Sequence, residues 1–138
     1  MKAIKKIVLS SLATVIGASL LVMNVEAQQT PKPWEVPAEF KNMKNPVASN
    51  EASIKAGGAL YMKNCASCHG KTGLGDGVKS RALKDYAGDF SGAYYQNQTD
   101  GEHFYKTKFG RNEMPKYEGK MSDEDIWNMV NYMRTFKK

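Results

Sequence analysis

The residues of this chain best suited to chemistry are two thiols and an imidazole in one hexapeptide, Cys65-Ala66-Ser67-Cys68-His69-Gly70. Cys65 and Cys68 are three positions apart, so both thiols lie on the same side of a helical turn. Thiols placed in this way can add to the two vinyl groups along one porphyrin edge, and C-x-x-C-H is the attachment pattern of a c-type haem. His69 can then be held against the iron as a neutral imidazole ligand. The spacing therefore predicts two thioether bonds and one axial iron ligand.

The same two cysteines could instead form a redox dithiol or half of a zinc site. A zinc site needs four ligands, and the chain contains two cysteines and two histidines, His69 and His103, without the spacing of a zinc finger. A thioredoxin-like dithiol occurs in a βαβ context, which this sequence lacks. The histidine directly after Cys68 favours the haem interpretation over both alternatives.

The first 27 residues have the pattern of a secretory signal peptide. Lysines precede an apolar run over residues 7–23, and Val25-Glu26-Ala27 provides small residues at the cleavage-type positions. We predict residues 1–27 as a signal peptide, with an exported, periplasmic mature chain that begins near Gln28. An uncleaved membrane anchor is the alternative, although the run is short for a bilayer span and is interrupted by serine, threonine and glycine.

Residues 28–138 are enough for one domain with one core. The full chain has a formal charge of +6, and its lysines are scattered along the sequence. Nucleic-acid binding would require a concentrated basic stripe, so we expect no nucleic-acid partner. The charge supports an acidic protein partner only weakly.

Residues 28–48 are predicted to form a proline-rich extended arm. Prolines at positions 31, 33, 37 and 46 interrupt this stretch, which has neither a helical nor an alternating apolar pattern. Its larger apolar residues are expected to fasten it to the folded body, and these are Trp34, Val36, Phe40 and Val47.

Two helices are predicted at the ends of a domain over residues 49–138. The first begins with Ser49 or Asn50 as its cap and runs into the cysteine motif, with apolar or small residues at three- and four-residue steps. The last is capped by Ser122, begins with acidic residues and carries an apolar stripe. Gly57 and Gly58 each cost a helix interior about 1 kcal/mol. A close crossing of the two helices would explain them.

Together these features resemble a class I c-type cytochrome domain of the small, exported bacterial kind. In that family a first helix, with glycine eight and an aromatic residue four positions before the first haem cysteine, crosses a C-terminal helix. Gly57 and Tyr61 have those positions here, opposite Met129 and Tyr132, and the likeness spans about residues 49–136. The resemblance implies an all-α cytochrome c-like fold, with crossing N- and C-terminal helices, around one covalently bound haem c and its iron. It also implies export, because thioether attachment in bacteria takes place outside the cytoplasm.

The glycine-rich segment 70–77 is predicted to make tight turns on the proximal side of the haem. It lacks the preceding strand of a phosphate-binding loop. Family members often have a proline in this region, whose neighbouring carbonyl accepts the N–H of the iron-bound histidine. Residues 70–114 contain no proline, so the sequence names no partner for His69.

The resemblance further implies that Met114 is the distal iron ligand. Family members place a methionine directly before a proline in a loop ahead of the last helix, and Met114-Pro115 has this form. Met121, just before the last helix, is the alternative methionine. A thioether ligand raises the reduction potential and closes the sixth coordination position of the iron.

His103 would instead give two histidine ligands if it reached the iron. It follows a capping box at Thr99–Glu102, and we expect it to be an ordinary, partly exposed residue of a short helix that ends near Gly110. Three aromatic residues of that helix are expected to line the haem pocket, and these are Phe104, Tyr105 and Phe109.

A haem with a closed sixth position predicts a one-electron carrier and not an enzyme. Its partners would be respiratory or periplasmic redox proteins, such as a respiratory complex or a terminal oxidase or reductase, and a membrane only if the N-terminal segment stays uncleaved. Lysines near the haem-bearing segments could steer acidic partners or simply be solvated. The alternative is a small peroxidase-like or gas-binding haem protein with an open or labile sixth site, in which His103 and Arg111 would act on the distal side.

Overall fold

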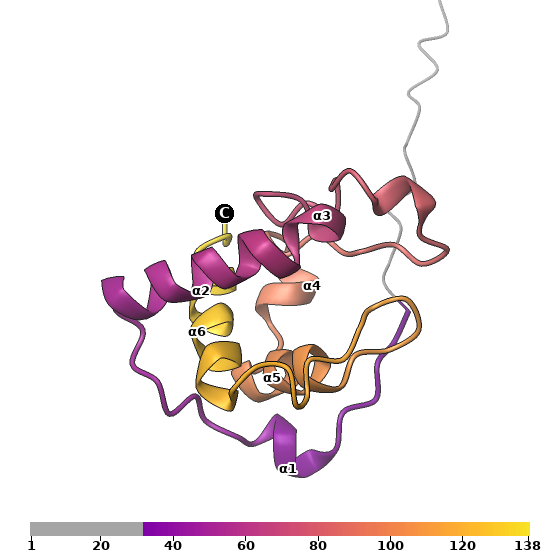
Figure 1. The fold of residues 1–138 in the computed structure, drawn as a ribbon. Helices are drawn as coiled ribbons and strands as arrows, with labels where there is room; N and C mark the ends of the chain where they lie inside the picture. The colour runs from indigo at the N-terminus through magenta and orange to yellow at the C-terminus, as the bar shows by residue number, and fades with distance from the viewer. Residues whose placement is uncertain (1–31) are drawn as a thin grey trace, which may run out of the picture.

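The computed structural model describes residues 32–138, so the predicted signal peptide and the first residues of the arm lie outside the described part. Over these residues the chain forms helices and no strands, as the all-α prediction requires (Figure 1). The helices are α1 (Ala38–Lys41), α2 (Glu51–Asn64), α3 (Ala66–His69), the short 3₁₀ helix η1 (Ser80–Ala82), α4 (Ala93–Gln96), α5 (Asp100–Phe109) and α6 (Asp123–Arg134). None of them, within residues 32–138, has the length and apolar character that a membrane span requires.

Helices α2 and α6 cross at close range and form the centre of the fold (Figure 1). The Asn50 side chain caps α2 by accepting a hydrogen bond from the Ser53 amide at 3.0 Å. At the crossing, a Cβ atom on Gly57 would lie 2.0 Å from the carbonyl oxygen of Asn128. The absence of a side chain at Gly57 is therefore what lets the two backbones approach. This confirms the predicted crossing of the N- and C-terminal helices.

Apolar side chains of α2 and α6 fill the core beneath this crossing. Tyr61, Ile126, Met129 and Val130 are all completely buried. The phenol of Tyr61 also donates a hydrogen bond to the Gly70 carbonyl at 2.8 Å, which ties the core to the end of α3. Burial of this apolar surface is the main stabilising contribution to a domain of this size.

The N-terminal arm, residues 32–48, wraps around α5 (Figure 1). It is not extended throughout, because Ala38–Lys41 forms one helical turn directly after Pro37. Proline suits this place, since its fixed φ fits a helix start and it lacks an N–H that would go unpaired there. The Phe40 ring packs against Tyr105 and Phe109 at centroid distances of 4.8 and 5.6 Å. The predicted fastening of the arm by its apolar residues is thus seen at Phe40.

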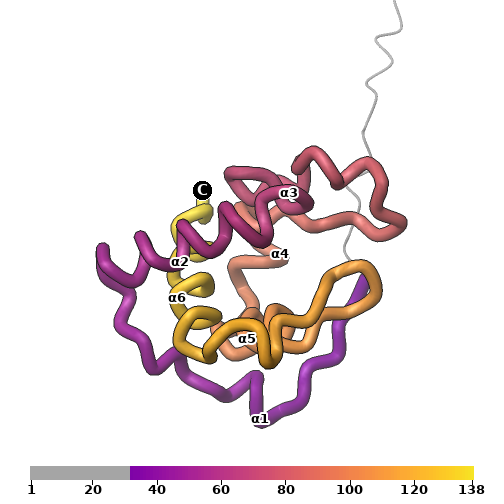
Figure 2. Tube along the Cα trace, in the orientation of Figure 1, coloured from indigo at the N-terminus to yellow at the C-terminus, as the bar shows by residue number. Residues whose placement is uncertain are grey.

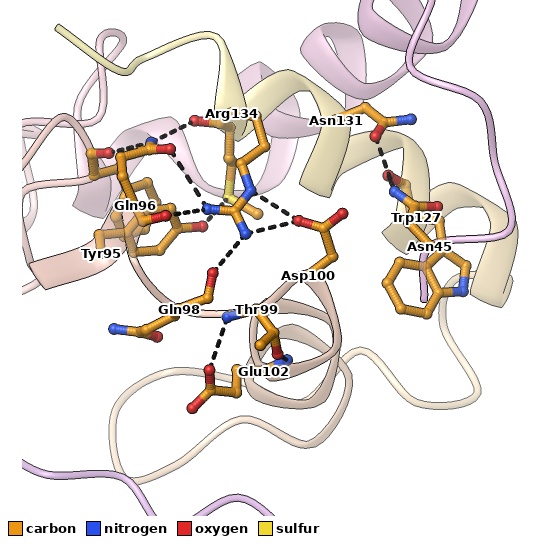
Figure 3. Close-up of polar contacts among 12 residues, drawn as sticks. Asn45, Tyr95, Gln96, Gln98, Thr99, Asp100, Glu102, Trp127, Asn131 and Arg134 are labelled. Atoms are coloured by element: carbon orange, nitrogen blue, oxygen red, sulfur yellow. Dashed lines mark hydrogen bonds and ion pairs between the residues drawn. The ribbon is translucent and has the colours of Figure 1, made fainter. Parts of the chain in front are cut away.

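Arg134 fastens the end of α6 to the segment between α4 and α5 (Figure 3). Its Nε donates to Asp100 at 2.8 Å, while its two Nη atoms donate to the carbonyls of Gln96 and Gln98 at 2.9 and 2.6 Å. The predicted Thr99–Glu102 capping box also forms and starts α5 at this point. These bonds fix the orientation of α5, whose inner face borders the candidate site.

Candidate haem site

The four predicted site residues Cys65, Cys68, His69 and Met114 all line one cavity of about 460 Å³. This volume is within the usual range of ligand sites, about 300–1,000 Å³. The first three residues come from the α2–α3 junction, whereas Met114 comes from the loop between α5 and α6. The fold therefore brings together two segments that lie far apart in the sequence.

The thiols are positioned by the single turn of α3, which begins directly after α2. The amides of Cys68 and His69 both donate to the Cys65 carbonyl, at 3.1 and 2.9 Å, so the three side chains belong to one tight turn. Both cysteines are free and half-buried. Burial raises the pKa of the Cys65 thiol to about 12, and the neighbouring Cys68 adds to the rise. A redox dithiol needs a low-pKa thiolate, so this site does not have the character of a thioredoxin-like pair.

His69 is held as a neutral imidazole. Burial lowers its pKa to about 4, and an interaction with the Ala87 backbone opposes part of this effect. Its Nδ1 atom is buried without a hydrogen-bond partner. Ala87 is therefore a backbone neighbour of the ring, which the sequence does not name, and not its acceptor. A neutral imidazole is the form that binds iron.

The glycine-rich loop after α3 packs tightly around this turn. The Gly75 amide donates to the His69 carbonyl at 2.9 Å and the Gly77 amide to the Cys68 carbonyl at 3.2 Å. A Cβ atom on Gly77 would lie 2.4 Å from the Ser67 carbonyl oxygen, so only glycine permits this approach. The segment makes the backbone turns that the sequence predicts for it.

Met114 lies at the end of a short turn in the distal loop. The backbones of Arg111 and Met114 exchange two hydrogen bonds, of 3.0 and 2.9 Å, and Asn112 between them is in the left-handed region with φ of 52°. Met121 packs against the hydrophobic core instead. Two methionines of α6, Met129 and Met133, also border the cavity, but both are buried in the core.

His103 is buried, with a side chain only 2% exposed, and not partly exposed as the sequence analysis expects. It lines the cavity, and its ring stacks on Tyr95 at 3.8 Å. The physical reason is that the side of α5 with His103 and Thr107 is turned inward. The arm packs closely on α5 at Gly101, where a Cβ atom would lie 1.8 Å from the Phe40 carbonyl oxygen. Within the stack, the rings of Tyr95 and Phe90 lie between His103 and His69. His103 is therefore not paired with His69 as a second iron ligand would be.

The aromatic lining of the cavity also differs from the prediction. Phe104 stacks on Trp127 at 4.1 Å in the core, while Tyr105 and Phe109 face Phe40 of the arm. The cavity is lined by other aromatic residues, namely Trp34, Tyr86, Phe90, Tyr94, Tyr95 and Tyr117. Of these, the sequence analysis names only Trp34, as a residue that packs the arm.

The buried state of His103 predicts a pH dependence of stability. Burial holds its pKa well below the ordinary value of 6.5, and the charges of Arg134 and Lys106 act in the same direction. Below about pH 6.5, His103 is protonated in the unfolded chain but stays neutral in the folded protein. The free energy of unfolding therefore falls as the pH falls below that value. We expect His103→Phe, which keeps a ring against Tyr95, to reduce this loss by on the order of 1 kcal/mol per pH unit. Urea unfolding at about pH 7.5 and pH 5 measures it, and an identical loss in both proteins would contradict the assignment.

The residues present fit a covalently attached haem. Two thiols and a neutral imidazole share one turn, Met114 lines the same cavity, and several aromatic residues line it as well. The buried nitrogens of His69 and His103 without hydrogen-bond partners mark the cavity as a place for a further polar or metal-bearing group. Within residues 32–138, no cluster of three or more His, Cys, Asp or Glu side chains could hold a bare metal ion. The donor set thus suits a haem better than a zinc ion.

A small all-α domain that places a C-x-x-C-H turn and a loop methionine around one cavity defines a class I c-type cytochrome. Residues 52–133 match the family model described as "Cytochrome C oxidase, cbb3-type, subunit III". The chain belongs to this family of cytochrome c domains. The predicted resemblance, fold class and cofactor are thereby confirmed: the protein is a monohaem cytochrome with covalently bound haem c, and it is an electron carrier.

Individual relatives agree with this assignment. The chain is 28% identical over 89 residues to cytochrome c6 of Thermosynechococcus vestitus, an alignment that covers 62% of this chain and 72% of the relative. It is 31% identical over 84 residues to cytochrome c6 of Gracilaria tenuistipitata var. liui, which covers 59% and 71%.

Two solved structures share the fold. The KustC0563 c-type cytochrome has a TM-score of 0.53 and 28% identity, covering 59% of this chain and 98% of that one. A chain of the Kuenenia stuttgartiensis reducing HAO-like protein complex Kustc0457/Kustc0458 has a TM-score of 0.61 and 22% identity. The alignment to the latter covers 70% of this chain but only 50% of that chain. At this identity the likeness concerns the fold alone.

Proposed function

We propose that Cys65 and Cys68 attach the haem by thioether bonds and that His69 and Met114 are the axial ligands of its iron. The observation that carries this proposal is that all four residues line one cavity. The haem supplies a one-electron change between its ferric and ferrous states. Within the chain, the α3 turn holds the thiols and the imidazole, and the distal loop presents a neutral sulfur that favours the ferrous state.

The protein would then be a mobile electron carrier with no enzymatic activity of its own. We propose export by a signal peptide at residues 1–27, an arm at 28–48 and a cytochrome domain at 49–138, with respiratory or periplasmic redox proteins as partners. Several lysines near the haem-bearing segments are exposed and available to steer an acidic partner, namely Lys63, Lys71, Lys79 and Lys120. Lys116 is also exposed but pairs with Glu118 at 3.9 Å. Lys106 and Lys108 are engaged elsewhere, with Gln98 and Asp123.

A peroxidase-like or gas-binding role has one observation in its favour, because His103 and Arg111 both border the cavity. Their side chains are committed to other contacts. The Arg111 guanidinium donates to the Pro33 carbonyl at 2.6 Å, and the His103 ring lies behind Tyr95. A distal pair that acts on a bound small molecule would need both groups to face the iron, so we favour the electron carrier.

Optical spectra of the haem-loaded protein test the proposal, with Met114→Ala beside the wild type. We expect the ferric wild type to show the weak far-red band of methionine bound to iron, and the ferrous wild type not to bind carbon monoxide. Met114→Ala loses the band, binds carbon monoxide, and has a potential lower by on the order of 0.1 V, because axial ligands tune haem potentials over about 0.8 V.

Met133→Leu is the matched control, since Met133 also borders the cavity but belongs to the core of α6. It should keep both the band and the resistance to carbon monoxide. A wild type that lacks the band and binds carbon monoxide readily would overturn the ligand assignment and bring forward the open-site alternative.

A further inference from the structure

The side chain of Arg111 joins the N-terminal arm to the turn that carries Met114. We propose that Arg111 is a positioning residue through which the arm keeps Met114 on the iron. This inference rests on the proposed role of Met114 as the distal ligand. It goes beyond the family assignment, because the arm precedes the residues 52–133 that match the family model.

The first step is the coupling of Arg111 to Met114 within the loop. Their backbones are joined in both directions, from the Arg111 amide to the Met114 carbonyl at 3.0 Å and from the Met114 amide to the Arg111 carbonyl at 2.9 Å. Gly110 before the turn has φ of 60°, and a Cβ atom there would lie 2.5 Å from the Met114 carbonyl oxygen. A displacement of Arg111 therefore displaces Met114 as well.

The second step is the attachment of Arg111 to the arm. Its guanidinium donates to the carbonyls of Pro33 and Lys32, at 2.6 and 3.3 Å. It also lies over the indole of Trp34, 4.3 Å from the ring centroid, and the Lys106 ammonium is 5.9 Å from the same ring. Figure 2 shows the beginning of the arm, in indigo, running beside the loop of Arg111 and Met114, in orange. Two hydrogen bonds and a cation–π contact thus meet at one side chain.

The third step is a connection to the segment after η1 on the other side of the turn. Glu113 accepts hydrogen bonds from the amides of Lys84 and Asp85, at 2.7 and 3.3 Å. Asp85 in turn accepts from Asn112 at 3.1 Å and pairs with Lys32 of the arm at 2.5 Å. The arm, the Met114 turn and residues 84–85 therefore form one polar network, and members of all three border the cavity.

The arm is well suited to hold this position because it is anchored independently. Val36 is buried, Phe40 packs on α5, and Asn45 donates a hydrogen bond to the Asn131 side chain of α6 at 2.8 Å. Proline at 33 and 37 limits the conformations available to the segment between these points. Release of Met114 from the iron by movement of its turn requires the contacts of Arg111 to break first.

The test measures how fast imidazole replaces Met114 on the ferric iron, because Met114 must leave before imidazole binds. We expect Arg111→Gln and Trp34→Ala each to bind imidazole about tenfold faster than the wild type, the effect of losing roughly one cation–π contact or charge-assisted hydrogen bond. Both variants should keep the far-red band at neutral pH. The double variant should be no faster than Arg111→Gln alone, because Trp34 acts through its contact with Arg111.

Two control variants separate positioning from other effects. Arg81→Gln removes an exposed arginine of η1 and should bind imidazole at the wild-type rate. Asn45→Ala removes the contacts with α6 at the far end of the arm, while Val36 and Phe40 still anchor the part next to Trp34. It should lower the free energy of unfolding without changing the imidazole rate.

Wild-type rates in both Arg111→Gln and Trp34→Ala would overturn the proposal, as would an equal acceleration in Asn45→Ala, which would show a general loss of stability. Failure of the underlying ligand assignment looks different. In that case the wild type itself lacks the far-red band, and Met114→Ala binds imidazole no faster than the wild type does.

Discussion

A variant with serine at both Cys65 and Cys68 is expected to contain no covalently bound haem. The chain has two cysteines, so no other thiol can replace the lost thioethers. Without the two thioether bonds the α3 turn no longer holds the haem against His69, and the cavity of about 460 Å³ in this small domain loses its covalently held occupant. We therefore also expect a large loss of helix content and of resistance to proteolysis.

Intact-protein mass and haem staining on a denaturing gel measure this result. Ser67→Ala is the matched control, because Ser67 lies between the two cysteines and does not take part in attachment. It should retain one haem per chain. Haem that stays attached to the doubly substituted protein under denaturing conditions would show that attachment takes place elsewhere.

The second large effect is expected at the helix crossing. In Gly57→Ala the new Cβ atom would lie 2.0 Å from the carbonyl oxygen of Asn128 and 2.4 Å from its carbonyl carbon. These are backbone atoms of α6, so the strain can be relieved only if the helices separate. We expect the free energy of unfolding to fall by about 3 kcal/mol, and further for Gly57→Val.

Gly58→Ala on the same helix is the control for this prediction. Its Cβ atom would meet the ring of Tyr132 at 3.0 Å, a side chain that can move aside. Alanine also gains up to about 1 kcal/mol over glycine in a helix interior, so this variant should be close to the wild type. Urea unfolding of the haem-loaded proteins compares the two, and equal stability of Gly57→Ala and Gly58→Ala would rule out a tight crossing.

Much of this fold could be predicted because its signals are local. The C-x-x-C-H motif depends on neighbours within one turn, and the two capping boxes that start α5 and α6 each involve residues three positions apart. Gly57 carried longer-range information, since a glycine in a helix interior is costly unless a backbone lies against it. Such patterns determine the helices, the crossing and the identity of the cofactor.

The tertiary structure alone decided which residues besides the four predicted ones line the cavity. The stretch His103–Phe109 mixes aromatic and basic residues without a clear one-sided apolar stripe, so its pattern does not show which face of α5 is buried. Contact with the arm decides it, placing His103 inside and Tyr105 and Phe109 against Phe40. The position of Ala87 beside His69 and of Trp34 beneath Arg111 likewise depends on segments distant in sequence. Spacing along the chain carries no record of such contacts, because they arise only when the separate segments pack together.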